Sequence, residues 1–121
     1  MQRELTHFVG GRRVSGTSGR FGDVYDPNTG RVQAHVPLAS AGEVLRAVDD
    51  AAAAQVDWAA QNPQRRARVM MRFLDLVQRE MDDLARLLAS EHGKTVPDAR
   101  GDIQRGLEVV EFAAGIPHLL K

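Results

Sequence analysis

Residues 91–121, EHGKTVPDARGDIQRGLEVVEFAAGIPHLLK, decide the fold because they combine a helix stop, a helix start and a helix with two different faces. Gly93 is typical of a helix C-terminus, since glycine adopts the left-handed conformation without strain. Thr95 is a capping residue for the next helix, and Pro97 in its first turn lacks only an N–H group that would have no partner there. We therefore expect a helix over residues 97–115.

The expected helix has two neighbouring faces that differ in chemistry. One is an apolar stripe, in which residues recur at positions i, i+4, i+7 and i+11: Ile103, Leu107, Val110 and Ala114. The other face is mixed and contains Gly101, Arg105, Glu108 and Phe112. This division is typical of an amphipathic helix.

Arg105 is the candidate ligand-binding residue of the mixed face, because Gly101 and Gly106 leave open space around its guanidinium. A planar fork of donors with room around it suits bidentate capture of a carboxylate or a phosphate. The alternative is an ordinary ion pair with Asp102 or Glu108, each three residues away, and spacing alone favours that alternative. The glycines cost about 1 kcal/mol each relative to alanine inside a helix, so something other than helix stability accounts for them.

The composition is that of an ordinary globular domain, with 121 residues, 43% hydrophobic and 26% charged. The 16 basic residues balance the 16 acidic ones, which gives no electrostatic reason to expect a nucleic acid or an anionic membrane as partner. No long apolar run and no signal-like N-terminus occur, so we expect a cytoplasmic protein. The sequence contains no cysteine, which excludes a thiol nucleophile and a thiolate metal site from these residues.

Two short antiparallel hairpins are expected over residues 7–37. The first turns at Gly10-Gly11, which supply the positive φ of a tight turn. Residues 15–22 are interpreted as a loop, and the second hairpin pairs residues 23–25 with residues 32–36.

In the second hairpin, the alternation of Val32, Ala34 and Val36 with polar residues predicts one buried and one solvated face. His35, on the solvated face, and His7, in the first hairpin, are interpreted as exposed residues and not as metal ligands. We expect no metal site in this chain.

Two further helices are expected, over residues 40–60 and 63–92. The first begins with a capping box of Ser40 and Glu43 and directs apolar residues inward: Val44, Val48, Ala51 and Trp58. The second begins at Asn62-Pro63 and carries a wide apolar face, and its pattern leaves open a break near residues 81–82. Three arginines lie near its start: Arg65, Arg66 and Arg68. They could form a nucleic-acid patch, but the chain is neutral and has no aromatic residues between them for stacking, which favours paired or solvated side chains.

These elements make a chain that is mostly α-helical, with a sheet too small to cover three amphipathic helices. The apolar face of the helix over residues 63–92 is wider than one partner helix needs. Our hypothesis is that the chain is part of a larger fold, and that by itself it is marginally stable or self-associating.

Several motifs resemble, in order and spacing, the N-terminal portion of the aldehyde dehydrogenase superfamily. They are FVGGRRV at residues 8–14, DPNTG at 26–30 followed by VQAHVPLAS, EHGKT at 91–95 and DARGD at 98–102. The stretch GDIQRGLEVVEFAAGIPHLL at residues 101–120 is similar to one branch, the CoA-acylating methylmalonate-semialdehyde dehydrogenases. The resemblance covers essentially the whole chain, although Asp26 stands where the family turn usually has asparagine.

The resemblance implies an α/β fold, of which residues 1–121 are the N-terminal part of the nucleotide-binding domain. It implies oxidation of malonate or methylmalonate semialdehyde with NAD, through a cysteine thioester, to an acyl-CoA, in a tetrameric enzyme. NAD and CoA are then cosubstrates of the complete enzyme, neither is expected to bind this segment alone, and no catalytic residue lies in it. Arg105 occupies the place of an arginine that holds the substrate carboxylate.

Three functional hypotheses follow. The first is an N-terminal segment of such an enzyme, inactive by itself and partnered by the rest of the dehydrogenase chain or another subunit. The second is an interaction module without catalysis that docks onto a complete dehydrogenase subunit. The third is another branch of the superfamily, in which Arg105 is coincidental.

Overall fold

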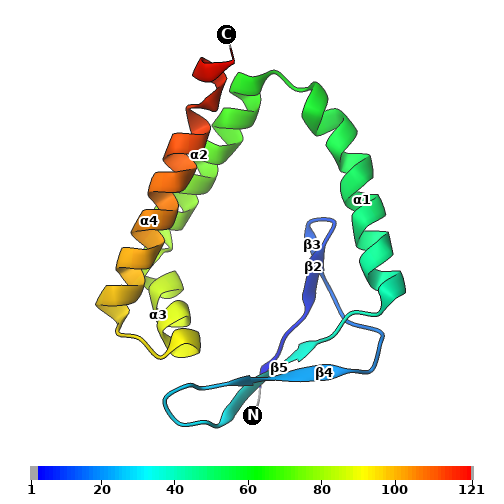
Figure 1. The fold of residues 1–121 in the computed structure, drawn as a ribbon, viewed down its shortest axis with the longest axis vertical. Helices are drawn as coiled ribbons and strands as arrows, with labels where there is room; N and C mark the ends of the chain where they lie inside the picture. Colours follow the sequence, from blue (N-terminus) through cyan, green and yellow to red (C-terminus); the bar gives the residue numbers. More distant parts are fainter. Residues whose placement is uncertain (1–2, 121) are drawn as a thin grey trace. The chain divides into compact units, whose positions relative to one another are not determined.

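The computed structural model describes residues 3–120, which divide into two compact units, Met1–Ala60 and Gln61–Lys121. The first unit holds all the strands and one helix, and the second holds three helices and a short 3₁₀ helix (Figure 1). The expectation of a mostly α-helical segment with two short antiparallel strand pairs is confirmed.

The first antiparallel pair joins β2 (His7–Val9) to β3 (Arg12–Val14). Gly10 and Gly11 make the turn between them with φ values of 60° and 74°. Side-chain-bearing residues rarely adopt these angles, so the glycine pair determines where the hairpin closes.

The second antiparallel pair joins β4 (Phe21–Tyr25) to β5 (Val32–Pro37). Asp26 organises the turn, because its Oδ1 atom accepts the Asn28 N–H at 2.8 Å and its carbonyl accepts the Gly30 N–H at 2.8 Å. The Asn28 N–H lowers the pKa of the Asp26 carboxyl. Aspartate therefore organises this turn through both its side chain and its backbone carbonyl.

Two features of this sheet differ from the sequence-based expectation. β1 (Arg3–Glu4) pairs in parallel with β5, which makes β5 the central strand of three. The strand β4 begins at Phe21, within the stretch predicted as a loop, because its backbone pairs with the end of β5.

The predicted alternation along β5 is only partly correct. Ala34 is buried, with 2% of its surface exposed, but Gln33 and His35 are half-buried because strands flank β5 on both sides. His35 also contacts Asp23, with 3.0 Å between Nδ1 and Oδ1. His7 is half-buried too, so the interpretation of both histidines as exposed is wrong.

The helix expected over residues 40–60 is α1 (Ala41–Ala60), and its capping box is formed as predicted. The Ser40 N–H donates to Glu43 at 2.8 Å, and the Glu43 N–H donates back to the Ser40 hydroxyl at 3.3 Å. The Thr17 N–H reaches the second Glu43 oxygen at 2.7 Å and so ties the preceding loop to the helix start. These bonds, led by that from the Ser40 backbone, lower the pKa of Glu43 to about 2.

The inward face predicted for α1 is not covered in the part of the chain that the structure describes. The helix has no buried residue, and Val44, Val48 and Trp58 are 52%, 57% and 38% exposed. An amphipathic helix with an uncovered apolar face needs a further surface to pack on.

The region expected as one helix over residues 63–92 forms two, α2 (Pro63–Arg79) and α3 (Met81–His92). The break lies at Glu80, one residue before the position that the sequence left open. Asn62 caps α2 by accepting the Gln64 N–H at 2.8 Å. The three arginines near the start of α2 are exposed or half-buried: Arg65, Arg66 and Arg68.

The last long helix, α4 (Val96–Ala114), packs against α2 and α3, and the 3₁₀ helix η1 (Ile116–Leu119) follows it. Within this unit, α2 and α4 run side by side (Figure 1). Gly93 ends α3 with φ 73°, and Thr95 caps α4 by accepting the Asp98 N–H at 3.4 Å. The predicted apolar stripe is the packed face: Leu107 and Ala114 are buried, and Ile103 and Val110 are half-buried.

The core of the described chain is small. Its buried hydrophobic residues are Ala34, Ala85, Ala99, Leu107 and Ala114, of which only one is larger than alanine. Many large apolar side chains stay exposed, as expected for part of a larger fold. Within residues 3–120, no helix is both long and apolar enough to cross a membrane, and no group of His, Asp and Glu is arranged to hold a metal ion.

Candidate functional site on helix α4

Arg105 lies in the middle of α4 and is exposed. Gly101 precedes it by one turn and Gly106 follows it directly. A Cβ atom built on either glycine meets no other atom within 4 Å. A side chain could therefore be added at either glycine without meeting another element of the unit.

The two acids that could pair with Arg105 do not do so. Among residues 3–120, no carboxylate oxygen lies within ion-pair distance of the Arg105 guanidinium. The ordinary alternative, in which Arg105 pairs with Asp102 or Glu108, is thus not what the structure shows. An exposed, unpaired arginine keeps its donors available for a ligand.

Asp102 is bound instead by Lys94, whose Nζ atom contacts the Asp102 Oδ2 atom. The Lys94 side chain is 21% exposed and that of Asp102 is 41% exposed, so this pair is partly shielded from water. The hydrogen bond from Lys94 is the main cause that lowers the pKa of Asp102, and the charges of Lys94, Arg105 and His92 add to it. Sequence reasoning missed this pair, because its two residues are eight positions apart across a helix boundary.

A second arginine of α4 behaves differently from Arg105. Arg100 forms an ion pair with Asp82 of α3 and so links the two helices. Of these two arginines, one is engaged in packing the unit together and the other faces outward. Of the two, only Arg100 has an ion pair among the described residues.

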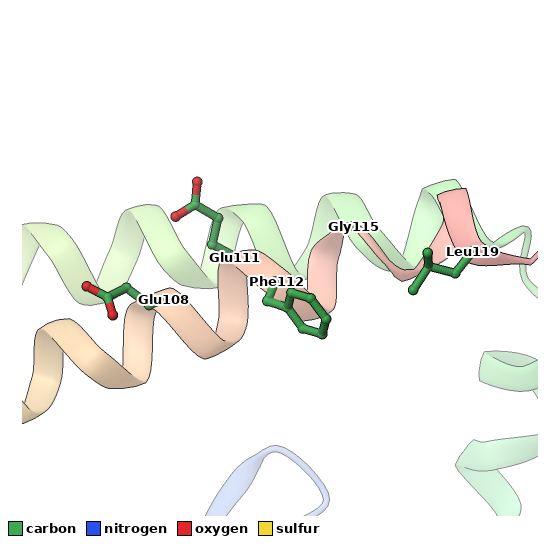
Figure 2. A pocket seen from close by; sticks show the side chains of 5 residues that line it. All are labelled: Glu108, Glu111, Phe112, Gly115 and Leu119. Carbon is green, nitrogen blue, oxygen red and sulfur yellow. The ribbon is translucent and has the colours of Figure 1, made fainter.

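Two depressions lie near the site, and neither suits an anion. One is lined by Glu108, Glu111, Phe112, Gly115 and Leu119 (Figure 2). Figure 2 shows its two glutamates leaving the helix in different directions, while the aromatic ring, 75% exposed, points away from α2. The other is an apolar groove between α2, α3 and α4, lined by Phe73, Val77, Leu84, Leu87, Leu88, Glu91, Ile103, Gly106, Leu107 and Val110.

Comparison with known proteins identifies the fold to which these helices belong. The model of the aldehyde dehydrogenase family matches residues 14–121. The chain belongs to the aldehyde dehydrogenase family. This confirms the resemblance that the sequence motifs carried.

Within this aldehyde dehydrogenase family, similar sequences include malonate-semialdehyde dehydrogenase 3 from Geobacillus kaustophilus, 46% identical over 118 residues. That match covers 98% of the chain and 24% of the relative. Malonate-semialdehyde dehydrogenase from Pseudomonas aeruginosa is 39% identical, with 97% of the chain and 23% of the relative covered. The chain thus spans about a quarter of the length of the relatives that it matches.

Solved structures give the same result. A putative methylmalonate-semialdehyde dehydrogenase from Sinorhizobium meliloti, complexed with NAD, is 57% identical with a TM-score of 0.96, over 100% of this chain and 25% of that one. Methylmalonate-semialdehyde dehydrogenase from Oceanimonas doudoroffii is 38% identical with a TM-score of 0.85, over 100% and 24%. The chain is therefore similar to one segment of these aldehyde dehydrogenases.

One depression of the second unit is lined by two glutamates and the other is almost entirely apolar, so neither provides the donors that a pyrophosphate requires. The sequence contains no cysteine, so these 121 residues supply no thiol.

Proposed function

We propose that the chain is the N-terminal segment of an NAD-dependent, CoA-acylating malonate- or methylmalonate-semialdehyde dehydrogenase, and that it is inactive by itself. In the complete enzyme it contributes Arg105 to the binding of the substrate carboxylate. The remainder of the enzyme supplies the cysteine nucleophile and binds NAD and CoA. A cytoplasmic location and tetrameric assembly are part of the same proposal.

The observation that carries the proposal is the state of Arg105. Its guanidinium is exposed, it makes no ion pair among residues 3–120, Gly101 lies one turn before it and Gly106 directly follows it. A malonate-type semialdehyde differs from a plain aldehyde by one carboxylate, and a planar guanidinium binds a carboxylate through two parallel hydrogen bonds. Charge-assisted hydrogen bonds contribute about 1.5–3 kcal/mol each, enough to separate these two kinds of substrate.

The similarity to malonate- and methylmalonate-semialdehyde dehydrogenases favours this branch over others of the family. Identities of 46% and 57% to proteins of those names accompany matches over nearly the whole chain. The rival proposal of an interaction module draws on the exposed apolar faces of α1 and the second unit. That rival predicts a soluble chain with a measurable partner and no requirement for Arg105.

The test uses a hybrid enzyme, in which residues 1–121 replace the matching quarter of the Geobacillus kaustophilus relative. Its kcat/KM is measured with malonate semialdehyde and with propanal, which has no carboxylate. We expect Arg105→Lys to lower kcat/KM for malonate semialdehyde about tenfold or more, because lysine cannot form the bidentate contact, and to leave propanal unchanged.

Arg100→Lys is the matched control, since it changes another arginine of the same helix that is paired with Asp82. It should affect both aldehydes equally, if at all. An equal loss on both aldehydes in the Arg105→Lys enzyme would refute the carboxylate role. An inactive hybrid with a correctly assembled fold would count against membership of this branch.

A further inference from the structure

Asp102 stands where it can compete with a substrate for Arg105. It precedes Arg105 by three residues on α4, and opposite charges at this spacing attract each other on a helix surface. The charge of Arg105 also contributes to lowering the pKa of the Asp102 carboxyl, so the two groups interact without touching. If nothing else held Asp102, it would neutralise the guanidinium that the substrate needs.

Lys94 holds that carboxylate away. Its Nζ atom contacts the Asp102 Oδ2 atom, and both side chains are less exposed than those of the Arg79–Glu80 and Arg86–Asp83 pairs. Shielding strengthens the attraction between the two charges, whereas exposed pairs contribute little. Arg105, which is exposed, is the weaker competitor for Asp102.

The backbone position of Lys94 is set by the two structures that flank it. Gly93 ends α3 in the left-handed conformation with φ 73°, and Thr95 caps α4. Lys94 is the single residue between this stop and this cap. Its position is therefore set by two local structures that do not depend on Asp102 or Arg105.

We propose that Lys94 is a positioning residue, which holds Asp102 and thereby keeps the Arg105 guanidinium free for the substrate carboxylate. This inference rests on the proposed function of Arg105. It adds a residue that contacts no substrate and acts through an acid on the neighbouring turn. Its chemistry is an exchange of partners: removing the Lys94 charge releases Asp102 to pair with Arg105.

The exchange can be measured in the chain itself by following the Asp102 carboxyl carbon in an NMR titration. With Lys94 present, Arg105→Gln should change the Asp102 pKa only slightly, because Lys94 remains the main partner. In Lys94→Met, Asp102 should turn to Arg105, so that adding Arg105→Gln raises the Asp102 pKa clearly. If Arg105→Gln has the same effect with and without Lys94, no exchange occurs and the proposal is overturned.

The functional consequence is measured in the hybrid enzyme. Lys94→Met should raise KM for malonate semialdehyde about fivefold, the effect of a competing ion pair of about 1 kcal/mol, with kcat and the use of propanal little changed. Adding Asp102→Asn should restore KM, since the competing charge is then gone. Failure of this rescue would overturn the proposal.

Asp82→Asn is the matched control, because it breaks the ion pair between Asp82 of α3 and Arg100 of α4 without releasing an acid beside Arg105. If Asp82→Asn raises KM as much as Lys94→Met does, loosened helix packing explains both and the positioning role is wrong. The outcomes separate this inference from the proposed function. If Arg105→Gln leaves KM for malonate semialdehyde unchanged, the proposed function is wrong. If Arg105→Gln raises this KM strongly and Lys94→Met does not change it, only the role of Lys94 is overturned.

Discussion

Replacing Gly101 or Gly106 by alanine should stabilise α4. Both glycines lie inside the helix, and a Cβ atom at either position meets no atom within 4 Å, so the substitution creates no clash. Alanine is favoured over glycine in a helix interior by about 0.8–1 kcal/mol, because glycine loses more backbone freedom on folding. Each change should therefore lower the equilibrium constant for the opening of α4 by about fourfold to fivefold.

Native-state hydrogen exchange of the α4 amides measures this effect, since it reports local opening even when a chain does not unfold in one step. The matched control is Gly93→Ala, at the left-handed position with φ 73° that ends α3. An alanine there is strained by about 1–2 kcal/mol and should speed exchange at the end of α3. Faster exchange in Gly101→Ala or Gly106→Ala would refute the description of an open helix face.

One of these substitutions, Gly101→Ala, should also weaken substrate binding in the hybrid enzyme. A methyl group at Gly101, one turn before Arg105, narrows the space in which a carboxylate would approach the guanidinium. We expect Gly101→Ala to raise KM for malonate semialdehyde while stabilising the helix. If it stabilises α4 and leaves KM unchanged, the glycines have no role in binding and their presence needs another explanation.

Three further predictions concern the stability of the two units. Leu107→Ala should destabilise the second unit by about 2–5 kcal/mol, because it removes the largest buried side chain, whereas Val109→Ala, at a site 68% exposed, should have little effect in urea unfolding followed by circular dichroism. The Glu43 carboxyl should titrate with a pKa of about 2 by NMR, and this pKa should be higher in Ser40→Ala, which lacks the side-chain hydrogen bond. Since this folded-state pKa lies below the unfolded value of 4.5, the stabilisation is present above pH 4.5 and is lost as the pH falls through about 2. The chain alone should self-associate with rising concentration in sedimentation velocity, because its large apolar side chains are exposed.

The sequence predicted well those features that depend on a few neighbouring residues. The caps at Ser40, Asn62 and Thr95 and the stop at Gly93 are formed as expected, since each needs only its own local hydrogen bonds or backbone angle. The packed stripe of α4 followed from helical periodicity alone. Such signals fix where elements begin and end.

Features that depend on distant residues were not predicted. The parallel pairing of β1 with β5 joins residues that are about thirty positions apart, and no local pattern indicates it. The inward face expected for α1 assumed a covering surface that the described residues do not supply. The Lys94–Asp102 pair crosses a helix boundary, so helical spacing on either side could not reveal it. For Arg105, spacing favoured an ion pair, whereas the flanking glycines and the family resemblance pointed to a ligand.

Binding of the substrate carboxylate by Arg105 can be measured by inhibition of the hybrid enzyme with malonate. Malonate carries the carboxylate but has no aldehyde to oxidise, so its inhibition constant measures binding without the chemical steps. We predict that Arg105→Gln raises this constant about tenfold or more, because a charge-assisted bidentate contact is lost. An inhibition constant that is the same in both enzymes would show that Arg105 does not bind the carboxylate.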